Sequence, residues 1–329
     1  MAEVHFIRSE EVSGLATTAE YVDAVREGYR QRGDGAPAKP RTTLEADDPQ
    51  GMLTGYLAML PETGVMGGYT YAAGFDERDA HFVLPLFDAE SGEPLAVFDG
   101  ASLNPHKTGA VGAVGVDALA RENASKLGLF GSGAQARGQL RAVATVRDLE
   151  RVAVYSPTHE HRQSFAEEMN DRLDATVTAV ETPRQAVTGS DVVITATKSS
   201  EPVFDSEWLE PGTHVTAMGQ YHPQKREIDA RTVARSTYVP DLRARIEQDA
   251  GAFMLARDEG AIEDEHVHAE LGDVVAGNAP GRADEDEITV FDSGGTAIET
   301  VAAAGMLYER AREAELGEQI TFAPASEAM

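Results

Sequence analysis

Apolar residues near the start of the chain recur at the spacing of an α-helix. The pattern predicts a helix that Thr17 or Thr18 caps and that runs to about Arg32. Its apolar side would be formed by Tyr21, Val22, Val25 and Tyr29. Further along, short apolar stretches separated by glycine and proline predict strands of a mainly antiparallel or mixed sheet: residues 52–60, 65–71, 81–87 and 94–98.

The second part of the chain alternates between short apolar runs and helical patterns. Asn104 and Pro105 predict a turn, and residues 108–122 a helix of small residues. Strands are then expected at residues 126–130, 151–155, 177–179, 191–195, 214–218 and 288–291. Helices are expected at residues 134–145, 160–170 and 297–311, with a helical turn after Thr182. This alternation is typical of a parallel sheet covered by helices.

A glycine-rich turn follows the strand predicted at residues 126–130. It contains the sequence Gly131, Ser132, Gly133, Ala134, Gln135, Ala136, and a helix is predicted to begin at once. Gly131 would allow the tight turn, Gly133 would let a pyrophosphate approach the backbone, and Ala136 would permit close packing of helix on strand. Strand, motif and helix together predict a nicotinamide dinucleotide site.

The end of the next strand would face the adenosine ribose of that cofactor. Position 156, where NAD-specific sites often have an acid, is Ser156, and Thr158 and Arg162 follow. Hydroxyls and a guanidinium would bind a 2′-phosphate. We therefore predict NADP(H) in preference to NAD(H); alternatively, Arg162 is a surface residue of the next helix. Cofactor contacts are also expected from Thr195, Ala196, Thr197, Met218 and Gly219.

The composition limits which partners the protein can bind and indicates the salt concentration to which it is adapted. The 329 residues carry a formal net charge of −28, and the pI is about 4.6. Such a surface repels nucleic acids and anionic membranes, so we expect neither as a partner. Only five of the 28 basic residues are lysines. Excess acid with so little lysine predicts adaptation to very high salt, where the Debye length falls to roughly 3 Å.

The chain contains no cysteine, which excludes disulfides and thiolate chemistry and fits a cytoplasmic protein. Residues 1–11 lack the apolar core of a secretory signal, and no apolar run approaches the roughly 20 residues that span a bilayer. His266 and His268 lie beside Glu263 and Glu265. This combination could bind a metal, but an acidic solvated face explains it equally well, and we predict no metal site.

Segments outside the dinucleotide motif make the chain resemble the ornithine cyclodeaminase/mu-crystallin family. With the motif itself they are residues 40–42 (Pro-Arg-Thr), 86–94, 128–137, 208–219 (with Pro-Gly-Thr-His) and 287–299. The resemblance implies an α/β fold in which a doubly wound Rossmann domain, residues 121–295, is inserted into a smaller α+β domain, residues 1–120 with 296–329. That smaller domain would bind substrate and form a homodimer. The implied reactions begin or end with hydride exchange at the Cα of a small amino or imino acid.

The polar positions of that family's substrate site can be matched residue by residue. Arg41 matches an arginine that binds the substrate carboxylate, a task suited to a bidentate guanidinium. Tyr69 stands where the family has a lysine, and Lys107 where it has a second arginine. Tyr221 stands where cyclodeaminases have an aspartate. Three polar positions are thus changed together.

These changes bear on the choice between reactions. Tyrosine is a far weaker base near neutral pH than the aspartate that serves the side-chain amine in cyclodeamination. We therefore predict an NAD(P)H-dependent imine reductase or amino-acid dehydrogenase, such as alanine dehydrogenase. Arg41 and Lys107 would hold the substrate carboxylate. The groups available for catalysis and proton relay are Lys107, Tyr69, Tyr221 and His222. Ornithine cyclodeaminase is the first alternative, and a mu-crystallin-like dinucleotide-binding protein with little catalysis is the second.

Overall fold

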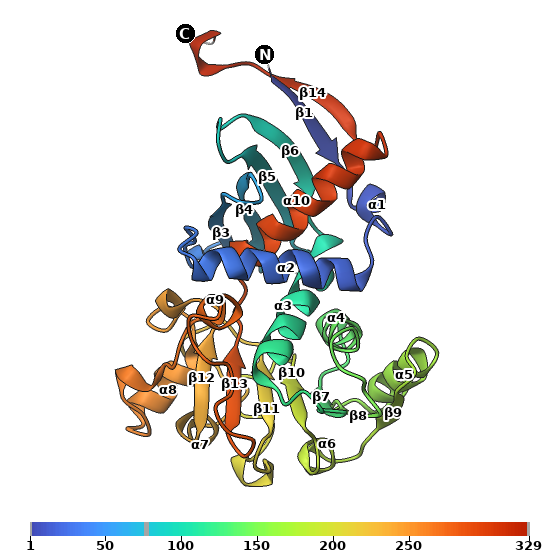
Figure 1. The fold of residues 1–329 in the computed structure, drawn as a ribbon, viewed down its shortest axis with the longest axis vertical. Coiled ribbons are helices and arrows are strands. Elements are labelled where there is room, and N and C mark those ends of the chain that lie inside the picture. The colour runs from blue at the N-terminus through green and yellow to red at the C-terminus, as the bar shows by residue number, and fades with distance from the viewer. Residues whose placement is uncertain (1, 76–78, 328–329) are drawn as a thin grey trace. The chain divides into compact units, whose positions relative to one another are not determined.

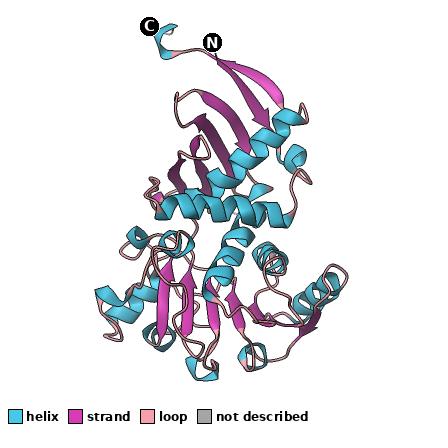
Figure 2. Cartoon of the chain, in the orientation of Figure 1, coloured by secondary structure: helices cyan, strands magenta, loops and turns pink. Residues whose placement is uncertain are grey.

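The computed structural model describes residues 2–75 and 79–327. Figure 1 follows the chain through its elements, and Figure 2 separates helices from strands. The chain forms two compact units: one contains the residues up to Lys107 and those from Thr296 onward, and the other is Thr108–Gly295. Each unit has its own sheet. The strand order is β14-β1-β6-β5-β4-β3-β2 in the first and β12-β13-β11-β10-β7-β8-β9 in the second.

The first sheet is antiparallel except where β1 lies parallel to β6. The strands predicted from the sequence are β3 (Gln50–Leu60), β4 (Val65–Ala73), β5 (His81–Asp88) and β6 (Pro94–Asp99). The pattern does not predict β1 (Ala2–Ile7), β2 (Thr42–Asp47) or β14 (Glu318–Phe322). The strands β2 and β14 are the edges of the sheet and expose most of their residues, so no buried face requires apolar alternation there.

Two long helices of the first unit pack on each other, and one of them covers the sheet. They are α2 (Thr18–Gly33) and α10 (Ala297–Glu313), and α10 contacts β3 and β4. The helix α2 confirms the first prediction, because Thr17 caps it and its apolar side is buried. A Cβ at Gly28 would lie 2.9 Å from the Cβ of Ala302, so glycine allows the two helices to approach closely. A single turn, α1 (Ser9–Val12), precedes α2.

The second sheet is parallel throughout and doubly wound. Its strands are β7 (Lys126–Phe130), β8 (Arg151–Tyr155), β9 (Thr176–Ala179), β10 (Val192–Thr195), β11 (His214–Ala217), β12 (Ser236–Pro240) and β13 (Ile288–Asp292). The strand order reverses beside β7, as in a Rossmann fold. The predicted α/β fold class is confirmed. Only the edge strand β12 was absent from the expected strands, because its sequence Ser-Thr-Tyr-Val-Pro contains no apolar run.

The helices of the second unit connect its strands. Those expected from the sequence are α4 (Ala134–Val143), α5 (His159–Asn170) and α6 (Pro183–Val187). The pattern does not predict the short helices α7 (Ala230–Ala234), α8 (Gly251–Asp258) and α9 (Leu271–Val275). Single 3₁₀ turns lie at Ser206–Trp208, Arg243–Arg245 and Asp264–His266, and another, Ala325–Glu327, belongs to the first unit.

The helix α3 (Leu103–Leu119) corrects the expected turn at Asn104 and Pro105. Both residues lie in the first turn of this helix. Proline is accepted there because the first amides of a helix have no partner within it.

The boundary between the two units was expected at residue 120. It lies instead within this helix, between Lys107 and Thr108. The glycines of the helix pack tightly within the second unit. A Cβ at Gly109 would lie 2.4 Å from the carbonyl oxygen of Gly138, and a Cβ at Gly115 would lie 2.4 Å from the ring of Phe291. Small residues are therefore required on this face of the helix.

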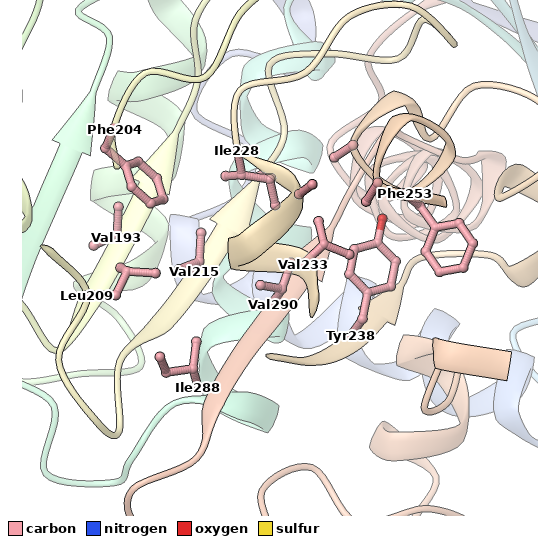
Figure 3. Close-up of a cluster of buried hydrophobic side chains, with 14 of the residues drawn as sticks. Val193, Phe204, Leu209, Val215, Ile228, Val233, Tyr238, Phe253, Ile288 and Val290 are labelled. Carbon is pink, nitrogen blue, oxygen red and sulfur yellow. The ribbon is translucent and has the colours of Figure 1, made fainter. Parts of the chain in front are cut away.

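A large apolar cluster stabilises the second unit. Figure 3 shows Val215 and Val290 from neighbouring strands together with Tyr238 and Phe253. All four side chains are fully buried. Burial of apolar surface stabilises by roughly 25 cal/mol per Å², so this cluster fixes the strands whose carboxyl ends are described below. Within residues 2–75 and 79–327, no helix combines the length and hydrophobicity needed to cross a membrane.

Candidate active site

The turn between β7 and α4 exposes backbone amides to open space. Gly131 has φ +112°, and a Cβ there would lie 2.4 Å from the carbonyl oxygen of Ala196, so only glycine fits. Gly133 precedes α4 without a side-chain cap, and the space around its missing Cβ is empty to 4 Å. The helix then begins with Ala134, Gln135 and Ala136, of which Ala136 is fully buried. Open amides at a helix start fit the pyrophosphate of a dinucleotide.

The loop after β8 holds two of the predicted ribose-facing residues. Ser156 is buried, and its hydroxyl oxygen lies 3.1 Å from the hydroxyl of Ser132, which donates to it. Thr158 is exposed and precedes α5. The turn after β7 and the loop after β8 are therefore linked by a side-chain hydrogen bond within the Rossmann unit.

Arg162 is turned into the protein and away from solvent. Only 6% of its side chain is exposed, and its guanidinium donates to the carbonyl oxygens of Ser156 (3.0 Å) and Pro157 (3.4 Å). It also forms an ion pair with Glu181, a residue after β9 that the sequence does not single out. Arg162 is thus not the surface residue of the alternative interpretation, and the guanidinium predicted to bind a 2′-phosphate already has an anionic partner.

Glu227 joins the carboxyl ends of β10 and β11. Its carboxylate accepts hydrogen bonds from the hydroxyl of Thr195 (2.9 Å) and from the amides of Thr197 (2.7 Å) and Gly219 (2.6 Å). Burial raises the pKa of Glu227, against the effect of these hydrogen bonds. The sequence interpretation named the three donors as cofactor contacts and missed the acid that fixes them. Of the other expected contacts, Met218 is buried, and the carbonyl of Ala196 faces Gly131.

In the first unit two cations lie near one aromatic ring. The guanidinium carbon of Arg41 is 5.7 Å, and the Nζ of Lys107 5.9 Å, from the ring centroid of Tyr56. Arg41 is 6% exposed and Lys107 3%. The sequence predicted both cations, and the structure brings them together around a tyrosine that it did not single out. Two cations shielded from water beside one ring suit an anionic group such as a carboxylate.

The hydroxyl of Tyr69 has a different role from the proton relay that we expected. It donates to the carbonyl oxygen of Gly100 at 2.7 Å, and its ring stacks on Phe82 with centroids 5.0 Å apart. Burial raises the pKa of Tyr69 well above its ordinary value. Because the proton is retained and already donated, this arrangement argues against the expected proton relay. The ring of Tyr69 instead lies beside Lys107, whose Nζ is 5.6 Å from the ring centroid.

Glu299 is the counter-ion of Lys107 and was also missed. Its Oε1 lies 3.3 Å from Nζ, and the side chain is fully buried. The same carboxylate accepts hydrogen bonds from the amide of Thr296 (2.6 Å) and the hydroxyl of Tyr29 (3.2 Å). A threonine three positions before the acid is the signature of a capping box, so a signal for part of this role was present in the sequence.

The remaining polar candidates lie in loops or 3₁₀ turns. Tyr221 is 41% exposed, and the Nδ1 of His222 accepts a hydrogen bond from the amide of Gln224 at 3.1 Å. His266 and His268 instead contact the carbonyl oxygens of residues 233 and 280. Over the part of the chain that the structure describes, no group of three or more His, Cys, Asp or Glu is placed to bind a metal ion.

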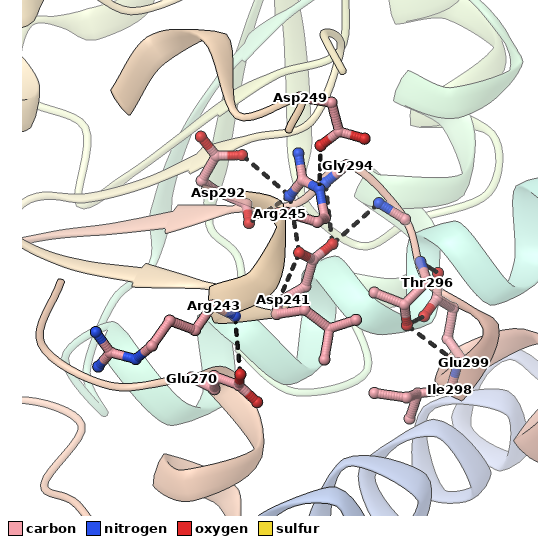
Figure 4. A network of polar contacts seen from close by, with 12 residues as sticks. Asp241, Arg243, Arg245, Asp249, Glu270, Asp292, Gly294, Thr296, Ile298 and Glu299 are labelled. Atoms are coloured by element: carbon pink, nitrogen blue, oxygen red, sulfur yellow. Dashed lines mark hydrogen bonds and ion pairs between the residues drawn. The ribbon is translucent and has the colours of Figure 1, made fainter. Parts of the chain in front are cut away.

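A buried ionic network lies at the carboxyl ends of β12 and β13 (Figure 4). The fully buried guanidinium of Arg245 contacts the carboxylates of Asp241 (2.7 Å), Asp249 (2.6 Å) and Asp292 (3.4 Å). Asp241 also accepts hydrogen bonds from the amides of Gly294 and Gly295, each at 3.0 Å. Burial raises the pKa of Asp292, although Arg245 acts to lower it. Sequence reasoning missed this network, because its members are scattered through polar segments.

The fold and these groups define a class: a Rossmann-type oxidoreductase with a nicotinamide cofactor and a separate unit that offers two buried cations. The model of the ornithine cyclodeaminase/mu-crystallin family matches residues 3–315. A Δ(1)-pyrroline-2-carboxylate reductase of Bacillus cereus is 35% identical over 241 residues, which cover 73% of this chain and 74% of the relative.

Solved structures agree with this match. The Δ(1)-pyrroline-2-carboxylate reductase of Thermococcus litoralis, in complex with NADH and L-proline, superposes with a TM-score of 0.91 at 31% identity, over 96% of this chain and all of the other. An archaeal alanine dehydrogenase dimer with bound NAD gives 0.91 at 32% identity, over 98% and 100%. The chain belongs to the ornithine cyclodeaminase/mu-crystallin family. It is an NAD(P)H-dependent oxidoreductase that acts on the C–N bond of an amino or imino acid.

Proposed function

We propose that the protein reduces an imino acid to the corresponding amino acid and that Arg41 and Lys107 bind the substrate carboxylate. The observation that supports this most directly is the pair of buried cations beside Tyr56. A guanidinium can hold a carboxylate in two parallel hydrogen bonds, and an ammonium adds a point charge. Two substrate classes are favoured by the relatives: a cyclic ketimine that gives L-proline, and the pair of pyruvate and ammonia that gives alanine.

The reaction needs little acid–base machinery. A hydride from the reduced nicotinamide adds to the imine carbon, the C=N π bond breaks, and the nitrogen takes a proton. Tyr221 and His222 are the groups that we propose for delivering this proton, since both lie in a partly exposed loop. Tyr69 is excluded from that role in the proposal, because its hydroxyl donates to Gly100. The pyrophosphate of the cofactor would lie on the amides around Gly133.

For the cofactor we propose that both NADPH and NADH bind, with NADPH favoured. The support is Ser156, which replaces the acid that would repel a 2′-phosphate. Structures of relatives contain NADH or NAD. The enclosed position of Arg162 weakens the preference expected from the sequence alone, because its charge is shared with Glu181.

We propose a homodimer formed by the outer face of the first sheet. Large apolar side chains are exposed there, all on β2, β3 or β5: Leu44, Leu53, Leu57, Met59 and Val83. Leu44 and Leu53 are direct partners across β2 and β3. Exposed apolar residues grouped on one sheet are unusual on so acidic a protein and mark an association surface. The archaeal alanine dehydrogenase is a dimer. Light scattering should give a dimer for the natural chain and a monomer for Leu57→Glu.

We propose that the protein is adapted to high salt. The net charge of −28 makes the folded chain repel itself, and salt screens that repulsion. The unfolding temperature should therefore rise steadily from 0.1 M to 3 M KCl. A flat or falling response would overturn this part of the proposal.

Steady-state turnover tests the central proposal. Δ(1)-pyrroline-2-carboxylate, and separately pyruvate with ammonia or methylamine, should be reduced with consumption of NADPH or NADH. If ornithine instead releases ammonia without net change in cofactor absorbance, the protein is a cyclodeaminase. If the cofactors raise the unfolding temperature but none of these substrates is turned over, it is a binding protein, and the enzymatic proposal fails.

A further inference from the structure

The ion pair of Arg162 and Glu181 takes no part in the proposed chemistry, yet it lies at a position that distinguishes the two cofactors. Arg162 comes from α5, and Glu181 follows β9. The arginine side chain is 6% exposed and the glutamate side chain 62%. The pair therefore has a buried cation and an anion that faces solvent.

Contacts on several sides hold the guanidinium in place. Its Nη1 donates to the carbonyl oxygens of Ser156 and Pro157, and its Nη2 lies 3.2 Å from the Nδ1 of His159. The same Nη2 donates to Glu181, whose other oxygen is 3.6 Å from that imidazole nitrogen. These carbonyls belong to the loop after β8, which faces the adenosine ribose in a Rossmann fold.

We propose that Glu181 weakens the binding of NADPH relative to NADH, by neutralising Arg162 and placing a carboxylate beside the ribose-facing loop. The inference rests on the proposed function, since it requires that a nicotinamide dinucleotide binds to this unit. A 2′-phosphate carries a charge of about −1.5 to −2. With Glu181 ionised, the phosphate meets a guanidinium whose charge is already balanced. The ribose hydroxyl of NADH has no charge and is indifferent to this balance.

The variant Glu181→Gln removes the negative charge and keeps an oxygen that can accept from Arg162. Because the side chain is largely exposed, the fold should tolerate the change. In water-like surroundings, losing one charge near the 2′-phosphate should tighten NADPH binding about three- to tenfold. The dissociation constant of NADH should change by less than about twofold. The gain for NADPH should shrink as KCl is raised, because mobile ions screen it.

Glu207→Gln is the matched control. It also removes a carboxylate from an exposed ion pair, with Arg231, on a 3₁₀ turn that comes before the amino end of β11. Parallel α/β sheets bind their ligands at the carboxyl ends of the strands, so this change should leave the ratio of the two dissociation constants unaltered.

Fluorescence titration of the purified full chain with NADPH and with NADH gives both dissociation constants without any turnover. The unfolding temperature of each variant without ligand shows whether it is folded, and Glu181→Thr replaces Glu181→Gln if the latter is not. An unchanged NADPH-to-NADH ratio in a folded Glu181 variant overturns the inference. Failure of the natural chain to bind either cofactor would instead overturn the proposed function, so the two failures are distinct.

Discussion

The ammonium nitrogen of Lys107 lies 3.3 Å from a carboxylate oxygen of Glu299, and the two side chains are 3% and 0% exposed. A buried pair of this kind is expensive to break, because the remaining charge has no water to solvate it. The same carboxylate accepts the capping hydrogen bond from the amide of Thr296 at the start of α10. One acid therefore both anchors a helix and holds a proposed substrate-binding cation.

Glu299→Gln should lower the free energy of unfolding by about 3 kcal/mol, the cost typical of removing one partner from a buried pair. Denaturant titration in constant KCl would measure it. The double variant Lys107→Met/Glu299→Gln should lose less free energy of unfolding than the two single variants lose in sum, because it leaves no unpaired charge. Strict additivity would show that the two groups are not coupled.

Arg41→Ala should weaken the binding of the substrate and not that of the cofactor. Loss of a charged hydrogen-bonding group costs about 1.5–3 kcal/mol, so kcat/KM for an imino acid should fall roughly 10- to 150-fold. The dissociation constant of NADPH should not change. Arg26, a partly exposed helix residue paired with Asp23, provides the control, and Arg26→Ala should behave like the natural chain. Equal losses in both variants would remove Arg41 from the site.

Two glycines of the dinucleotide turn should respond differently to substitution. Gly131→Ala forces a Cβ to within 2.4 Å of a carbonyl oxygen at positive φ, so the protein itself should be destabilised. Gly133→Val fills open space, so the unfolding temperature without ligand should stay near that of the natural chain. Binding of NADPH and NADH should be lost in both. Cofactor-induced stabilisation that persists in Gly133→Val would place the pyrophosphate elsewhere.

His214 should make the protein sensitive to acid. It is fully buried between the hydroxyls of Thr289 and Thr216, each 2.9 Å from a ring nitrogen. Burial lowers the pKa of His214 from 6.5 to about 3. The folded chain therefore keeps this ring neutral where the unfolded chain protonates it, between about pH 6.5 and pH 3. Stability should fall as the pH is lowered through this window, with His214 contributing up to about 1.4 kcal/mol per pH unit.

The variant His214→Gln removes that titration and keeps polar atoms for both hydroxyls. Its free energy of unfolding, followed from pH 7 to pH 4, should depend on pH less steeply than that of the natural chain. Parallel curves for the two proteins would mean that His214 does not account for the loss of stability in acid.

The sequence by itself determined the elements whose pattern has a local physical cause. The strand before Gly131 and the helix after it follow from apolar runs, from glycine, and from the amides that a helix start leaves free. The cap at Thr17 and the alternation of strands with helices have the same local origin. Arg41 and Lys107 could be named in advance, because carboxylate recognition requires cations in segments that match the family.

Only the tertiary structure decided which groups balance those charges. Glu299 is 192 positions from Lys107, and Glu181 is 19 positions from Arg162, so no local pattern pairs them. The apolar pattern did not predict the edge strands β2 and β14 for a related reason. Their stability comes from neighbouring strands and not from a buried face of their own. Burial turns such distant partners into strong interactions, because charges removed from water must be neutralised inside the fold.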